Sequence, residues 1–317
     1  MKEREVKAIV AKSEAFVENV EGTEETIFLA QPNKSVTAVY EDYASWFECV
    51  CPILERYHAG KVIALDLPDI WVRDFLPLQN IQTGKLFSPL YWPSYQSAKL
   101  GRFYETIRAR VRELFPEVEQ MPLVRLDGGN LIVNKRGVGF SVFNPKMFQP
   151  EQKDTIANAL ESALGLTKLH WLPALPSAYD PFGHADGFGN FVGDDTIITC
   201  ISNSADNVEK KIHHDVISII ESAGIKCLTI RTNTPIDYSG DNNKSAKGCY
   251  GNFLETSSAV FVPQYNIPDD DTAMEIIQSC TDKPVVGIDC EAISKHGGSL
   301  HCLTKELAII RSNNQVN

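Results

Sequence analysis

Hydrophobic and polar positions along the chain repeat one order of elements. A stretch with helical periodicity is followed by an apolar run, a polar turn and a second apolar run. Three copies are clearest, because their turns share a Gly-Asn pair whose asparagines (Asn130, Asn190 and Asn252) are 60 and 62 residues apart. The pattern predicts helices over Gly101–Phe115, Pro150–Leu164 and Ala205–Ala223, each followed by a strand at Leu123–Asp127, Lys168–Pro173 and Cys227–Thr232.

The same order continues at both ends of the chain. A helix over Val39–Tyr57 leads to the apolar segments KVIALDL, WVRDFLPL and KLFSPLY, and a helix over Asp270–Cys280 leads to VVGIDC and GGSLHCLT. The first apolar run, Glu25–Gln31, precedes any helix and could complete the last unit circularly. Since a unit of this size cannot bury its own apolar face, five units stacked around an axis are expected.

A doubly wound parallel sheet is the alternative α/β architecture. It calls for a Gly-rich phosphate turn after a strand, and neither GxGxxG nor GxxxxGK[ST] is present. No linker, low-complexity tract or change in composition divides the chain. We therefore expect a charged N-terminal extension over residues 1–24 and a single domain over residues 25–317.

Composition and charge narrow the functional classes. The 317 residues carry 30 Lys and Arg against 41 Asp and Glu, a net charge of −11 that argues against nucleic-acid partners and suits a cationic ligand. The chain has no signal-peptide pattern and no apolar run long enough to span a membrane. Its eight cysteines lack paired short spacings. A cytoplasmic protein with reduced thiols and no membrane partner is expected, and a homo-oligomer is left open.

Polar residues gather in the turns that follow the predicted strands. In a ring of repeats these turns converge at one end of the axis, so their side chains should meet in one pocket. A cysteine, a histidine and several carboxylates together are the parts of nucleophilic catalysis on a cationic electrophile. The residues in question are Trp71, Arg73, Asp74, Asp127, Asn130, Asp180, His184, Asp186, Asn252, His301 and Cys302.

Several of these features also have ordinary structural explanations. Arg73 and Asp74 could form a surface ion pair, and Trp71 could be core packing. The pair His213–His214 lies on a predicted helix among charged residues, which indicates solvated side chains. A metal held by His184, Asp186 and Asp74 is conceivable, but sites built from hard oxygen ligands rarely include a cysteine as well.

Taken together, the motifs resemble the agmatine deiminase and bacterial peptidylarginine deiminase family of the guanidine-modifying superfamily. The resemblance extends from about Glu25 onward, and GGSLHCLT is its most specific segment. It implies the pentein fold, a five-fold pseudo-symmetric α/β propeller. The segments that carry it are WVRDFLP, DGGN, DPFGHAD, YGNF with FVPQY, VVGIDC and GGSLHCLT.

Residue roles follow from that resemblance. Cys302 would attack the guanidinium carbon, and His184 would protonate the departing ammonia and then activate water. Asp74 and Asp186 would hold the guanidinium nitrogens, and Trp71 would pack beside the substrate. Asp180, Asp127 and Asn252 match further substrate-binding positions. The resemblance implies no metal, nucleotide or redox cofactor.

The sequence departs from the agmatine deiminase pattern at three places. Leu76 replaces a glycine, Asp127 replaces a glutamate, and Tyr91–Lys99 keeps the expected aromatic segment only loosely. This Tyr91–Lys99 segment also lacks the arginines that peptidylarginine deiminases direct at a substrate carboxylate. Agmatine, converted to N-carbamoylputrescine and ammonia, is the favoured substrate. Protein or peptidyl arginine is the alternative, followed by an amidinotransferase or a non-catalytic binding protein.

Overall fold

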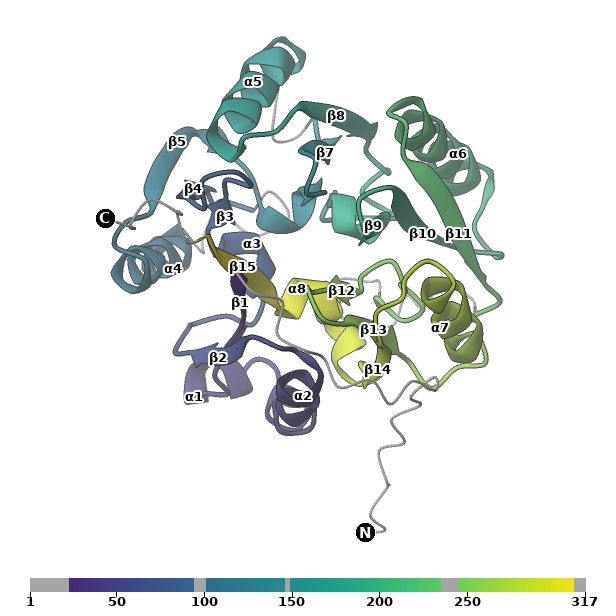
Figure 1. The fold of residues 1–317 in the computed structure, drawn as a ribbon, viewed down its shortest axis with the longest axis horizontal. Coiled ribbons are helices and arrows are strands. Elements are labelled where there is room, and N and C mark those ends of the chain that lie inside the picture. The colour runs from purple at the N-terminus through teal and green to yellow at the C-terminus, as the bar shows by residue number, and fades with distance from the viewer. Residues whose placement is uncertain (1–22, 94–100, 146–148, 235–244, 311–317) are drawn as a thin grey trace, which may run out of the picture.

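Five three-stranded sheets surround a common centre in the computed structural model, which describes residues 23–93, 101–145, 149–234 and 245–310 (Figure 1). In every sheet the first strand runs antiparallel to the middle strand, and the middle strand runs parallel to the third. The parallel pair is joined by a helix that lies on the outside of the ring (Figure 1). The predicted ring of five α/β units is confirmed.

The elements of each unit follow in the order first strand, middle strand, helix, third strand. The units are β15 (Lys305–Ile310), β1 (Thr23–Ala30), α1 (Lys34–Thr37) with α2 (Tyr43–Tyr57) and β2 (Lys61–Leu65); β3 (Leu78–Gln79), β4 (Leu86–Leu90), α4 (Gly101–Leu114) and β5 (Glu119–Arg125); β6 (Ile132–Val133), β7 (Val138–Phe143), η3 (Pro150–Gln152) with α5 (Lys153–Leu164) and β8 (Lys168–Pro173); β9 (Gly189–Val192), β10 (Thr196–Ser202), α6 (Asn207–Ser222) and β11 (Lys226–Thr232); β12 (Leu254–Glu255), β13 (Val260–Gln264), α7 (Asp270–Gln278) and β14 (Val285–Asp289).

Circular closure of the ring joins the two ends of the described chain. Strand β1 pairs antiparallel with β15, with Phe28 opposite Lys305, and parallel with β2. The expectation that the first apolar run completes the final unit is therefore confirmed. Residues 1–22 lie outside the described part of the chain, so the boundary placed at residue 24 stays a prediction.

Local sequence signals explain most helix boundaries. Helix α6 begins after Asp206, whose side chain accepts hydrogen bonds from the backbone of Val208 and Glu209. Helix α5 ends at Gly165, which adopts the left-handed conformation (φ 68°). Strand β5 begins at Glu119 and ends at Arg125, whereas the sequence predicts Leu123–Asp127; its register against β4 shifts between Pro89 and Leu90, and Leu123 is exposed.

Short helical turns connect the third strand of one unit to the first strand of the next. Turns α3 and α8 lie near the centre of the ring (Figure 1). None of the helices in the described ranges is long and apolar enough to cross a membrane. The connecting turns are α3 (Val72–Phe75), η2 (Gly128–Asn130), η4 (Ala185–Gly187), η5 (Ile293–His296) and α8 (Leu300–Leu303).

Candidate active site

The inter-unit turns enclose a cavity of about 210 Å³ that collects most of the residues singled out by the sequence. Polar side chains on four of its sides come from different units of the ring. Since these side chains stand in the connections between units, the repeat itself explains how residues far apart in the chain meet. The predicted residues that line the cavity are Trp71, Asp74, Asp180, His184, Asp186, Asn252 and Cys302.

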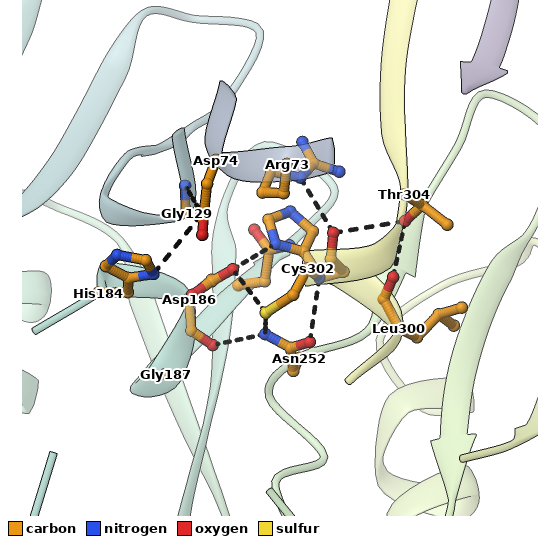
Figure 2. A network of polar contacts seen from close by, with 12 residues as sticks. Arg73, Asp74, Gly129, His184, Asp186, Gly187, Asn252, Leu300, Cys302 and Thr304 are labelled. Carbon is orange, nitrogen blue, oxygen red and sulfur yellow. Dashed lines mark hydrogen bonds and ion pairs between the residues drawn. The ribbon is translucent and has the colours of Figure 1, made fainter. Parts of the chain in front are cut away.

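Cys302 on α8 is held between an amide and a carboxylate (Figure 2). The side-chain amide of Asn252 donates to its sulfur at 3.3 Å, and its own backbone N–H donates to Asn252 Oδ1 at 3.3 Å. The thiol in turn donates to Oδ2 of Asp186 at 3.6 Å. Burial, followed by the charges of Asp186 and Asp74, raises the pKa of the Cys302 thiol well above its ordinary value. With the cavity empty, the sulfur is therefore a protonated thiol.

Asp186 on η4 is the carboxylate of the cavity that hydrogen bonds and nearby positive charges stabilise most. His301 Nδ1 donates to Asp186 Oδ2 at 2.8 Å, and Arg73 and His184 add positive charge nearby. Burial alone would raise the pKa of Asp186. The hydrogen bond and charge of His301, followed by the charges of His184 and Arg73, outweigh burial and lower this pKa below its ordinary value. Asp186 is a permanent anion at neutral pH.

Asp74 on α3 has fewer hydrogen-bond donors and less positive charge around it than Asp186. Its Oδ1 accepts one backbone N–H, from Gly129 at 3.0 Å, and lies 3.7 Å from His184 Nδ1. Burial raises the pKa of Asp74 to about 7, and repulsion from Asp127 and Asp186 adds to the rise against the attraction of His184. A Cβ at Gly129 would lie 2.7 Å from Asp74 Oδ1 and 2.9 Å from His184 Nδ1, which explains the glycine of the DGGN segment.

His184 stands between two carboxylates. Its Nδ1 faces Asp74, and its Nε2 donates to Asp127 Oδ2 at 3.2 Å. Burial would lower the pKa of His184, but Asp74 and Asp127 outweigh burial and raise it to about 10. The imidazole is therefore a cation at neutral pH. Asp127 itself is only 1% exposed and is not among the residues that line the cavity. The structure thus places it against the histidine, away from the substrate position expected for it.

An aromatic wall and a further carboxylate complete the lining. The indole N–H of Trp71 donates to the Tyr40 hydroxyl at 3.0 Å, and the two rings meet edge to face. A Cβ at Gly298 would come within 2.3 Å of the Trp71 ring, so only glycine fits beside the indole. Asp180 is partly exposed and accepts the backbone N–H of Phe182 at 2.9 Å.

Two structural interpretations of the sequence are wrong. Arg73 does not pair with Asp74 on the surface, because its buried guanidinium binds both carboxylate oxygens of Glu306 on β15 and its Nε donates to the His301 carbonyl at 3.1 Å. His213 is buried, and burial followed by the charge of Arg231 lowers its pKa to about 4, whereas His214 is exposed as expected.

A chain of contacts behind Asp186 is not predicted by the sequence. It runs from His301 through Arg73 to Glu306 and holds the carboxylate that contacts the nucleophile candidate. His301 stood in the most specific motif next to Cys302, which was the available signal. Glu306 carried none, because its partner Arg73 lies 233 residues away in the chain.

Comparison with known proteins agrees with this arrangement. The model of the family described as Porphyromonas-type peptidyl-arginine deiminase matches residues 2–307. A Streptococcus mutans relative, provisionally named an agmatine deiminase, is 24% identical over 288 residues, or 78% of this chain and 76% of that protein.

Solved structures show the same fold. A C. jejuni agmatine deiminase variant with substrate bound superposes with a TM-score of 0.73 at 17% identity, covering 90% of this chain and 93% of that one. The dimethylarginine dimethylaminohydrolase of Pseudomonas aeruginosa superposes with a TM-score of 0.59 at 14% identity, covering 89% and 98% of the two chains. The fold is the expected pentein fold. This chain belongs to the Porphyromonas-type peptidyl-arginine deiminase and agmatine deiminase family, and it is a guanidine-modifying hydrolase of that family.

Proposed function

We propose that the protein hydrolyses agmatine to N-carbamoylputrescine and ammonia through a covalent amidino-cysteine on Cys302. One observation carries the proposal. The Cys302 sulfur lies against Asp186 and Asn252 in the same cavity as Asp74 and a cationic His184. A nucleophile, a proton donor and two carboxylates for a planar cation are thereby assembled in one place.

Binding of the guanidinium is the first step. Its planar N–H groups can form forked hydrogen bonds with carboxylates, and Asp74 and Asp186 both face the cavity. The bound cation relieves the repulsion between the two carboxylates. It also stabilises a thiolate at Cys302, so the thiol transfers its proton to solvent when the substrate binds. Before the substrate binds, burial and then the charges of Asp186 and Asp74 raise the pKa of the thiol well above its ordinary value.

Attack by the thiolate forms a bond from sulfur to the guanidinium carbon. The carbon–nitrogen bond to one terminal amino group then breaks, and His184 transfers its proton to that nitrogen as ammonia leaves. The product of this half is an amidino group joined to Cys302. Since the pKa of His184 is raised to about 10, the proton is present before the reaction begins.

Hydrolysis reverses the role of the histidine. Neutral His184 accepts a proton from water as the water oxygen attacks the amidino carbon, and the carbon–sulfur bond breaks to return the thiolate. The hydroxyl proton of the adduct passes to solvent as the carbonyl forms, so the released product carries a neutral ureido group and His184 is again a cation. Cys302 regains its proton from solvent when the product leaves. Asp127, in contact with Nε2, keeps the ring oriented with Nδ1 toward the cavity through both halves.

The surroundings of the cavity support an amine-tailed substrate over free arginine. A neighbouring cavity of about 180 Å³ shares Asp180, Phe182 and Cys249 with the catalytic one and offers room for a tail. Among the described residues that line the two cavities, Lys247 is the one Lys or Arg, and its amine is engaged by Glu291. The α-carboxylate of free arginine would find no unpaired Lys or Arg there.

A ureido-product assay over four substrates tests the proposal. We expect turnover of agmatine with kcat/KM at least about 100-fold above that for free arginine, a difference of roughly 3 kcal/mol for an unpaired carboxylate. A blocked arginine peptide and methylated arginines complete the panel. Preference for the peptide over agmatine would replace agmatine by peptidyl arginine as substrate, and absence of turnover with all four would refute the deiminase proposal.

A further inference from the structure

A second cavity, of about 470 Å³, lies on the other side of the α3 and α8 turns. It is lined by residues from the first strands of all five units: β3, β6, β9, β12 and β15. Arg73 and His301 line it, whereas their chain neighbours Asp74 and Cys302 line the catalytic cavity. No residue lines both cavities. The two are therefore separate spaces with a common wall, and we call the larger one the axial cavity.

Lys305 at the start of β15 is a buried lysine that lines this axial cavity. Its side chain is only 7% exposed, and within the described part of the chain its amine has no hydrogen-bond or ion-pair partner. A buried amine without a partner is costly, and structures rarely keep one. Burial, followed by the charge of Arg73, lowers the pKa of Lys305 to about 7, with Glu306 and Asp74 acting in the opposite direction.

The carboxylates of the axial cavity are already satisfied. Glu306 is bound by Arg73, and Glu255 by Lys283, which stands outside the lining. Glu25 accepts hydrogen bonds from the backbone and hydroxyl of Ser257 at 2.7 and 2.9 Å. The remaining cation, Lys135, is exposed to solvent. Lys305 is thus the buried Lys or Arg of this lining whose side chain has no carboxylate partner among the described residues.

We propose that the axial cavity is a binding site for a carboxylate ligand with an apolar body, whose carboxylate pairs with the Lys305 amine. The volume lies within the range of small-molecule sites, roughly 300–1,000 Å³. One unpaired amine matches one negative charge, whereas a phosphate dianion would meet the nearby carboxylates without enough donors. The hydrocarbon part of the ligand would contact Leu78, Leu131, Ile132, Leu166, Phe191 and Leu254.

Calorimetric titration of the full-length protein with hexanoate tests this site. We expect hexanoate to bind one site per chain, and hexylamine and inorganic phosphate to bind at least about 10-fold more weakly. Lys305→Met keeps the length of the side chain and removes the amine, and it should weaken hexanoate binding at least about 10-fold. Lys135→Met removes the exposed lysine of the same lining and should leave the affinity unchanged. Equal affinities for the wild type and Lys305→Met would overturn the proposal.

Two further measurements keep the test decisive if Lys305→Met does not fold. Because a bound carboxylate raises the pKa of the amine, hexanoate binding at pH 8 should take up protons, seen as a heat that depends on the ionisation enthalpy of the buffer. Binding without proton uptake would contradict pairing with Lys305. Saturation of the Cys302→Ser protein with agmatine should leave hexanoate binding intact. Competition between the two would place hexanoate in the catalytic cavity and overturn the proposal.

Discussion

Asp74 and Asp186 face the same cavity and are almost equally buried, yet burial leads to opposite results at the two carboxyl groups. The pKa of Asp186 is lowered, because His301 donates to it and Arg73 lies behind His301. The pKa of Asp74 is raised to about 7, because burial and two neighbouring carboxylates oppose one N–H donor and His184. Asp186 has enough hydrogen-bond donors and positive charge around it to lower its pKa. Asp74 does not, so burial raises the pKa of Asp74.

This difference fits the proposed binding of a guanidinium, because one carboxylate is stabilised by the fold itself and the other has too little positive charge around it. A site with two fully compensated carboxylates would gain little from a guanidinium, and a site with two uncompensated ones would be costly to fold. Here the side with η4 and α8 supplies a permanent anion next to the thiol. The α3 side supplies a carboxyl group with less compensation, and in the proposed mechanism the guanidinium would be its partner.

Removal of the Cys302 sulfur should have the largest effect on activity. Cys302→Ala should reduce turnover more than about 10⁴-fold, because no other nucleophile reaches the guanidinium, while the fold and agmatine binding persist. Mass spectrometry of acid-quenched wild-type protein should show an amidino adduct on the peptide that contains Cys302. An active alanine variant, or an adduct on another cysteine, would remove Cys302 from the mechanism.

Loss of the histidine facing Asp74 should rank second. If His184 is the acid of the first half and the base of the second, His184→Ala should slow both halves by about 10²–10⁴-fold. Rapid-quench kinetics resolves adduct formation from adduct hydrolysis. The exposed histidine on α6 provides the control, since His214→Ala should change neither rate. Wild-type rates for both halves would leave His184 with a structural role only.

Matched substitutions of the two carboxylates test the comparison directly. Asp74→Asn should cost roughly 2–5 kcal/mol in kcat/KM, because the guanidinium loses its uncompensated partner. Its melting temperature should stay equal or rise. A carboxyl group whose pKa is raised in the fold stabilises the protein when protonated and loses that contribution as pH rises toward 7, so the neutral amide removes a cost.

Asp186→Asn should show the opposite change in stability. Its pKa is lowered in the fold, so the ionised form stabilises the protein above the ordinary Asp pKa and this contribution is lost on neutralisation. We expect the free energy of unfolding to fall by about 1–3 kcal/mol, together with activity. Thermal denaturation of both variants at pH 8 decides the matter. A lower melting temperature for Asp74→Asn, or a higher one for Asp186→Asn, would contradict the comparison.

The sequence predicted the fold and the residues of the cavity better than the electrostatic interactions that set their pKa values. Hydrophobic periodicity and the Gly-Asn turns were enough to predict the ring of five units, because each unit has an apolar face that only a neighbouring unit can bury. The converging turns also brought Asp74, His184, Asp186 and Cys302 to one cavity. The repeat did not reveal that Arg73 pairs with Glu306, since that contact joins α3 to the closing strand β15 and has no counterpart in the repeated pattern. Opposite pKa shifts at two aspartates depend on such partners, and residue type alone does not show them.

Asp127 provides the finest test of the α3 side of the cavity, because it contacts His184 directly and its charge also acts on Asp74. The pH profile of kcat/KM should fall below about pH 7, where Asp74 is protonated, and above about pH 10, where His184 loses its proton. Asp127→Asn keeps an acceptor for Nε2 but removes a negative charge that favours the imidazolium. The pKa of His184 should fall, moving the alkaline limb down by about 1–3 pH units. Asp180→Asn, which alters a carboxylate lining the same cavity without contacting His184 in the described structure, should leave that limb in place. A higher KM with no movement of the limb would return Asp127 to direct substrate contact, and a shifted limb with an unchanged KM would keep it behind the histidine.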